Sequence, residues 1–216
     1  MPGQLVLASA SPRRKEMLER VGFSIKLMPA SIDEVPFPDE APEPYVKRMA
    51  RMKVLAVVER IQQTLYPDTE AGRIPRGLLR DTPLRWVLGA DTAVVLGPQV
   101  LGKPRDHEDA AEMLARLQGT EHMVVPGFCL YDMKKSKEGL QAVPTGVRLK
   151  RMGPAEIEKY LSVGESMDKA GAYAIQGVGA YIVDSITGSY TNVVGLPLCQ
   201  VVEMMEEMGA SDVVPF

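Results

Sequence analysis

The stretch LVLASASPRRKEML, residues 5–18, sets a short apolar run, two serines and a proline before a basic pair. This order predicts a strand, a tight turn and the start of a helix. Ser11 and Pro12 suit the N-cap and the first helical position, where proline loses no hydrogen bond. Arg13 and Arg14 then fall in the first turn, where the helix dipole disfavours a cation by about 0.3–1 kcal/mol unless an anion compensates. Either the turn binds a phosphate group, or both arginines point into water or pair with surface carboxylates.

Length and composition indicate an ordinary globular protein. The 216 residues suggest one domain, with room for a smaller lobe, and they are 45% hydrophobic and 25% charged. The net charge of −3 argues against a general nucleic-acid or anionic membrane surface as partner, since either favours a basic protein. Any anion site must therefore be local.

The few cysteines and histidines exclude several classes of site. Cys129 and Cys199 lack the spacing of a disulfide framework or a metal knuckle, and His107 and His122 are far apart in the sequence. A zinc site and a Ser-His-Asp triad therefore have little support. The sequence has neither the pattern of a leader peptide nor an apolar run near 18 residues, so we expect a cytoplasmic protein in a reducing compartment.

Residues 23–28 predict a second strand, which leads into the acidic, proline-rich segment ASIDEVPFPDEAPEPY at 30–45. Prolines and acids at this density predict an irregular connection. Glu34 follows the strand closely. It either lies in a solvated loop or presents a carboxylate to a metal ion at a strand-end crevice.

Residues 44–65 have helical periodicity, and Lys53 falls on the apolar face between Met49 and Val57. An ammonium group at that place must either extend outward to water or meet an anion, such as a second phosphate. At 66–85 the periodicity is lost, and proline, glycine and arginine predict an exposed insertion. That insertion is either a solvated loop or a contact for nucleic acid or a partner.

The segment WVLGADTAVVL, residues 86–96, predicts an almost continuously apolar strand that contains Asp91 and Thr92. A carboxylate in such a strand is costly to bury unless it is paired, protonated or bound to a metal. Asp91 is therefore the strongest candidate for chemistry, the alternative being a buried cap for backbone N–H groups. A turn then leads to VLGKP and places Lys103 near the end of a hairpin partner. No Walker pattern accompanies this GKP.

The rest of the chain predicts further elements without obvious chemistry. We expect helices at 107–117 and 153–161, a hairpin of strands 123–133 and 143–152 joined by the turn KKSKEG, and a final amphipathic helix through Leu198 and Met205. Gln176 is expected on a short strand flanked by glycines. Its amide either reads the edge of a base or closes a turn.

The order SASPRR, IDE, the helix with Lys53, GADT, GKP, DKAGAYAIQG and NVVGLP resembles the Maf family of nucleoside triphosphate pyrophosphatases, over about residues 5–205. The resemblance implies a single Maf-like domain over residues 1–216. Its fold would be an elongated α/β structure, with a mixed, strongly curved sheet flanked by helices and a cleft between two lobes, as in inosine triphosphatase (Maf/Ham1). The segment at 66–85 would be an insertion in that domain.

The family hydrolyses nucleoside triphosphates to a monophosphate and pyrophosphate with a divalent metal, Mg²⁺ or Mn²⁺, and its members commonly form homodimers. No nucleic-acid or membrane partner is expected, on the basis of the net charge. Ser9, Arg13 and Arg14 match the nucleotide-binding loop. The residues expected around the phosphates are Glu34, Lys53, Asp91 and Lys103. Asp91 matches the family's proton acceptor, and Glu34 and Asp91 are the expected metal ligands.

Arg13, Thr92 and Gln176 occupy the positions that distinguish branches of the family, and their combination resembles the branch acting on dTTP and UTP. The chain departs from the family beside Lys53, where Met52 and Val54 replace the usual glutamate and alanine. Two alternatives stay open. One is a regulatory nucleotide-binding protein of cell division that acts through partners, and the other is a phosphatase that releases orthophosphate.

Overall fold

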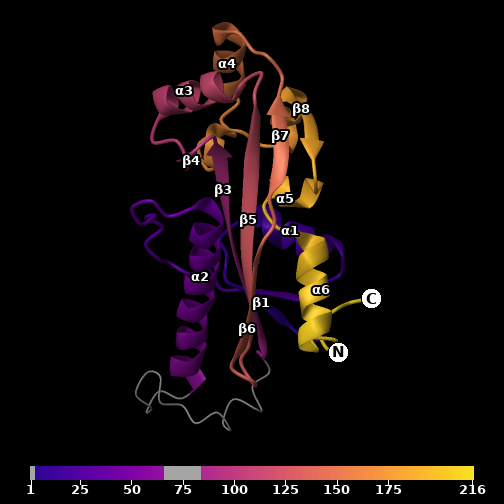
Figure 1. Ribbon diagram of the computed structural model, residues 1–216. Coiled ribbons are helices and arrows are strands. Elements are labelled where there is room, and N and C mark those ends of the chain that lie inside the picture. The colour runs from indigo at the N-terminus through magenta and orange to yellow at the C-terminus, as the bar shows by residue number, and fades with distance from the viewer. Residues whose placement is uncertain (1–2, 66–83) are drawn as a thin grey trace. The chain divides into compact units, whose positions relative to one another are not determined.

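The computed structural model describes residues 3–65 and 84–216 (Figure 1). All but the last two residues of the predicted insertion at 66–85 lie outside the described residues. Hydrogen bonding orders the strands β2-β1-β3-β5-β7-β8, with β4 paired to β3 and β6 to β5. The predicted α/β fold with a mixed sheet and flanking helices is confirmed. Among the described residues, no helix combines the length and the apolar character needed to cross a membrane.

The chain forms two compact units, each assembled from separate segments. The first contains Met1–Asp91, Gly127–Ala142 and Leu196–Phe216, and the second contains Thr92–Pro126 and Val143–Gly195. The long strands β3 (Trp86–Leu96) and β5 (Glu121–Asp132) each contribute residues to both units.

The first unit also contains β1 (Leu5–Leu7), α1 (Pro12–Arg20), β2 (Ile25–Leu27), α2 (Pro42–Leu65), β6 (Lys137–Ala142) and α6 (Leu198–Met208). Strand β1 runs parallel to both neighbours, with Leu5 opposite Ile25 on β2 and Trp86 on β3. Strand β5 is antiparallel to β6.

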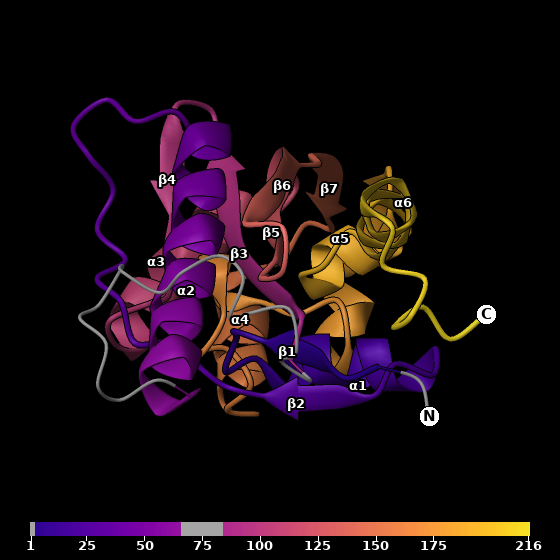
Figure 2. The same ribbon diagram turned by 90° about the horizontal axis from the view of Figure 1, so that it is seen from below.

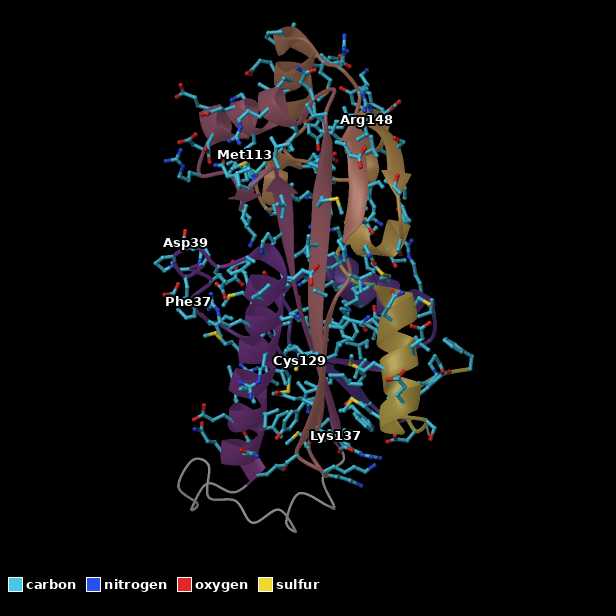
Figure 3. The ribbon with its side chains drawn as sticks, viewed as in Figure 1. Phe37, Asp39, Met113, Cys129, Lys137 and Arg148 are labelled. Atoms are coloured by element: carbon cyan, nitrogen blue, oxygen red, sulfur yellow. The ribbon has the colours of Figure 1, made fainter. Side chains whose placement is uncertain are left out.

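Helices cover both faces of this sheet. Successive side chains of a strand point to opposite faces, so each strand contributes to two cores. Leu5 and Leu7 belong to a buried cluster with Val201 and Met205 of α6. Val6 and Ala8 point the other way, into a cluster with α2 and Cys129 of β5. Figures 1 and 2 show α2 and α6 on opposite sides of these strands, and Figure 3 marks Cys129 in the interior. Burial on both faces explains why β1 and β3 read as continuous apolar runs.

The second unit contains β4 (Gln99–Leu101), α3 (His107–Leu117), β7 (Thr145–Leu149), α4 (Pro154–Leu161), two 3₁₀ helices η2 (Ala170–Ala172) and η3 (Gly177–Ile182), β8 (Val183–Thr187) and α5 (Tyr190–Val194). Its core packs the apolar faces of α3 and α4 against the strands, with Leu114, Val147 and Tyr160 fully or almost fully buried. The predicted strand at 86–96 and helix at 107–117 are confirmed.

The predicted hairpin of strands 123–133 and 143–152 is wrong. The returning chain forms two strands, so that β6 pairs with residues 127–132 of β5 and β7 pairs with residues 121–124. Pro144 lies between β6 and β7, and a proline has no N–H group to continue a ladder of hydrogen bonds. The turn is also shorter than predicted, because β6 already begins at Lys137 within KKSKEG.

The strand predicted around Gln176 is also wrong. Gln176 is the N-cap of the 3₁₀ helix η3, and η2 precedes it in the chain. Gly171 and Gly177 have φ angles of +70° and +69°, a region that side-chain-bearing residues rarely adopt and that breaks an extended strand. The glycines therefore mark turns in this segment.

Candidate active site

A cluster of charges around the buried Lys53 joins three of the predicted site residues in the first unit. Lys53 Nζ lies 2.6 Å from Asp91 Oδ1 and 2.6 Å from Glu34 Oε1. The side chains of Lys53 and Asp91 are only 10% and 13% exposed, whereas that of Glu34 is 44% exposed. The Lys53 ammonium therefore does not extend outward to water. It meets two anions, and both are carboxylates of this chain. Removing one member of such a buried pair typically costs about 3–5 kcal/mol, because the other charge is left uncompensated.

The close approach of α2 to β3 brings Lys53 to Asp91. A Cβ atom on Gly89 would lie 2.6 Å from the carbonyl oxygen of Ala50 and 2.7 Å from Val54 Cγ2. Only glycine fits this contact. Because Gly89 lies two residues before Asp91, and Ala50 lies less than one helical turn before Lys53, the same contact sets the separation of the two charges.

Two residues of α2 that the sequence did not single out hold the loop of Glu34. The Tyr45 hydroxyl donates to the backbone oxygen of Glu34 at 2.9 Å. Arg48 Nη2 donates to the backbone oxygen of Val35 at 3.1 Å, and its Nε donates to Glu40 Oε1 at 2.7 Å. The Arg48 guanidinium also lies 3.9 Å from the centre of the Phe37 ring (Figure 3 labels Phe37 on this loop). Tyr45 and Arg48 are three residues apart on one helical face, which is the only signal in the sequence.

The ionisation of Tyr45 suits this role. Burial, followed by the nearby carboxylates of Asp91 and Glu34, raises the pKa of Tyr45 to about 12. The phenol therefore stays protonated at neutral pH and remains a hydrogen-bond donor to the loop.

The predicted turn between β1 and α1 is built around Ser9 and Arg14. Arg14 is buried, and its Nη1 donates to Ser9 Oγ at 2.9 Å and to the backbone oxygen of Ala90 at 2.8 Å. Ser9 Oγ also accepts from Ser11 N at 3.3 Å. Because the oxygen of Ser9 accepts both bonds, its proton remains available to a further acceptor such as a phosphate oxygen.

The two neighbouring arginines therefore differ. Burial lowers the pKa of Arg14, the carboxylate of Asp91 opposes this effect, and the guanidinium stays charged. Arg13 is only partly buried and forms no ion pair with any residue in 3–65 or 84–216. Ser11 is the N-cap of α1 as predicted, but its side chain makes no capping bond. The first turn thus keeps N–H groups that an anion can bind.

Substitution by methionine is expected to separate the roles of the two arginines. Arg14→Met removes the guanidinium donor from the Ala90 oxygen and leaves Ser9 Oγ with Ser11 N alone, which should lower the free energy of unfolding by about 2–4 kcal/mol. Arg13→Met should change it by less than about 0.5 kcal/mol but raise KM for a nucleoside triphosphate. Denaturant unfolding and steady-state kinetics of both variants test this, and an equal loss of stability in the two would contradict it.

The other predicted site residues lie in the second unit. Lys103 is exposed, directly after β4, and it forms no ion pair within the described part of the chain. Thr92 Oγ1 donates to the backbone oxygen of Gly195 at 3.4 Å. Gln176 is half-buried, and its side chain makes no capping bond to η3. The roles of these residues, and the predicted cleft between lobes, stay predictions.

The donors near Lys53 fit a magnesium or manganese ion that a nucleotide helps to bind. Glu34 and Asp91 supply hard carboxylate oxygens, and both contact the same ammonium, so they are close enough to share one cation. In the described ranges no group of three or more His, Cys, Asp or Glu side chains could hold a metal without help. Mg²⁺ is commonly bound by one or two carboxylates together with substrate phosphates, so two carboxylates suffice for such a site.

Comparison with known proteins identifies the family of the chain. A family model described as Maf-like protein matches residues 4–208. A dTTP/UTP pyrophosphatase of Syntrophotalea carbinolica is 43% identical over 95% of this chain and 85% of its own length. Proteins with the same name from Citrifermentans bemidjiense and Geobacter sulfurreducens are each 44% identical, over 95% and 96% of this chain and 96% and 98% of their own lengths. Given a match of this extent, the chain belongs to the Maf-like protein family.

Proposed function

We propose that this protein hydrolyses dTTP and UTP to the nucleoside monophosphate and pyrophosphate. The observation that carries the proposal is the buried Lys53–Asp91 pair, contacted by the exposed Glu34, in the same unit as the Ser9–Arg14 turn. The names of relatives with 43–44% identity along nearly the whole chain support the same reaction and the same substrates.

In the proposed reaction a water molecule attacks the α phosphorus, and the bond from that phosphorus to the oxygen bridging to the β phosphorus breaks. Asp91 accepts the proton of the attacking water, because it is the carboxylate held in place by a buried ammonium. General base catalysis of this kind contributes about 10²–10⁴-fold to the rate. Lys53 fixes the position of Asp91 between the strand and α2.

The cations of the site neutralise the triphosphate. We assign Arg13, the first turn of α1 and the Ser9 hydroxyl to the phosphate oxygens, because a guanidinium and a helix N-terminus both attract anions. Arg14 supports this turn from within. Lys103 is the further cation that we assign to the phosphates, on the basis of the family resemblance.

A divalent metal, Mg²⁺ or Mn²⁺, is part of the proposal. Glu34 and Asp91 would hold it together with the nucleotide. When bound, such an ion neutralises phosphate charge and acidifies a coordinated water. Turnover is therefore expected to require added metal and to be lost in excess chelator.

Base selection is assigned to Thr92 and Gln176. A Gln176 amide presents both a donor and an acceptor, which matches a uracil or thymine edge. Gln176→Glu removes the donor and adds a negative charge, so we expect kcat/KM to fall about tenfold or more for dTTP and UTP but less for other nucleotides. An equal loss for every nucleotide would make Gln176 a structural residue.

The test of the proposed function is pyrophosphate release by the purified protein across dTTP, UTP, CTP, 5-methyl-UTP, 7-methyl-GTP and the standard purine triphosphates. Preference for dTTP and UTP is the expected result. Release of orthophosphate would indicate a phosphatase. No turnover of any nucleotide would favour the regulatory nucleotide-binding protein. Light scattering of the same sample tests the homodimer that we infer from the family resemblance.

A further inference from the structure

The segment around Gln176 is fixed by side chains outside the family motifs. Gln176 itself makes no capping bond and is only half-buried, so its position depends on the backbone on either side. Ala174 precedes it by two residues, and Val178 and Gly179 follow it within the first turn of η3. Their N–H groups are all bound by two residues, one near the end of α4 and one in the loop after it.

Glu165, in the loop after α4, binds the backbone that follows Gln176. Its Oε1 accepts from Gly179 N at 2.5 Å, and its Oε2 accepts from Val178 N at 3.3 Å. A carboxylate that accepts two backbone N–H groups forms charge-assisted bonds, which are stronger than bonds between neutral groups. Glu165 thus fixes the turn that begins directly after Gln176.

Tyr160, on α4, binds the backbone that precedes Gln176. Its hydroxyl oxygen accepts from Ala174 N at 3.2 Å, and the residue is 1% exposed. Burial is the first cause that raises the pKa of this tyrosine, so its phenol remains protonated at neutral pH.

Gly179 shows how tightly this arrangement closes. A Cβ atom there would lie 2.3 Å from the backbone oxygen of Ala174, 2.8 Å from Glu165 Oε1 and 2.8 Å from the Tyr160 hydroxyl. The backbone before and after Gln176 is thus in direct contact, with the two polar side chains against it. Any shift of Glu165 must move the turn next to Gln176.

We propose that Glu165 is a positioning residue for base selection, which holds Gln176 in the orientation that favours pyrimidine triphosphates. This inference rests on the proposed function. Glu165 itself makes no contact with the nucleotide. It acts through the Val178 and Gly179 amides, and Tyr160 supports it from the other side.

The test compares Glu165→Gln with Glu156→Gln. A glutamine has a single carbonyl oxygen and cannot accept from both amides with two oxygens, so one of the two N–H groups loses its partner. Glu156 is a matched control, since it is also half-buried and close in sequence but pairs with Lys150 at 2.6 Å. The readouts are kcat/KM for UTP and for CTP, and hydrogen exchange of the Val178 and Gly179 amides.

In Glu165→Gln, we expect exchange of those amides to accelerate and the preference for UTP over CTP to fall roughly tenfold, the size expected when a hydrogen bond to a charged group is lost. Glu156→Gln should change neither readout. Faster exchange with an unchanged preference in an active protein would overturn the inference, because Glu165 would then be only structural. Absence of turnover by the unaltered protein would instead overturn the proposed function, and the inference with it.

Gly179→Ala provides a second variant that leaves Glu165 and Tyr160 in place. Its methyl group would collide with the Ala174 carbonyl and displace the turn, so it should also reduce the preference for UTP over CTP. Circular dichroism and the melting temperature show whether either variant remains folded. If a folded Gly179→Ala protein kept the full preference, the orientation of Gln176 would not depend on this turn, and the proposal would fail.

Discussion

Replacing Asp91 by asparagine is expected to abolish nucleotide hydrolysis while the protein stays folded. Asparagine keeps the size of the side chain and an oxygen that accepts from Lys53, and Lys53 still has Glu34 as a partner. It cannot take a proton from water. We expect kcat/KM for dTTP to fall by about 10³-fold or more, within the range for loss of a general base. Pyrophosphate release and a thermal melt of the same preparation measure both quantities.

Asp132→Asn is the matched control. Asp132 is also a buried carboxylate in an ion pair, since Arg85 Nη2 lies 2.7 Å from its Oδ2, and it accepts from Lys134 N at 2.9 Å. This substitution should lower the melting temperature but leave kcat/KM within about twofold, because no step of the proposed reaction uses it. Near-normal activity in Asp91→Asn, or an equal loss in both variants, would remove Asp91 from the role of proton acceptor.

Lys53→Met is expected to lower activity sharply. Without the ammonium, the carboxylates of Glu34 and Asp91 lose the cation that both contact. Asp91 is then no longer held in place, so hydrolysis loses an oriented proton acceptor. At neutral pH we expect a loss of about 10²-fold, since orientation and charge neutralisation are lost together.

Lys47→Met, on the same helix, supplies the comparison. Lys47 is only partly buried and forms no ion pair with any residue that the structure describes. Its replacement should leave kcat/KM within about twofold in the same steady-state assay. Near-normal turnover in Lys53→Met would show that hydrolysis does not need Lys53 to hold Asp91 in place.

Patterns of hydrophobicity predicted the strands and helices whose buried residues follow a regular period in the sequence. The strand at 86–96 and the helix at 107–117 have the observed bounds, because apolar runs and helical periodicity reflect burial directly. The same reasoning singled out Asp91 and Lys53, since a charge on an apolar face must find a partner. In the structure, Asp91 and Lys53 are each other's partner.

Contacts between distant segments could not be predicted in this way. The sequence does not tell that Tyr45 and Arg48 reach back to the loop of Glu34, or that Glu165 binds the turn after Gln176, because each bond ends on a backbone atom, which has no sequence signature. Arg13 and Arg14 also appeared equivalent. Only the fold reveals that Arg14 points inward to the Ala90 oxygen.

The segmented first unit has a consequence for how the protein is made. Its core joins Leu5 and Leu7 of β1 to Val201 and Met205 of α6, which follow much later in the chain. On a ribosome, β1 must therefore wait with one apolar face uncovered until α6 has been synthesised. Contacts this far apart in sequence slow folding. We expect nascent chains that stop before α6 to expose this face to chaperones and proteases, whereas the second unit has all its segments by residue 195.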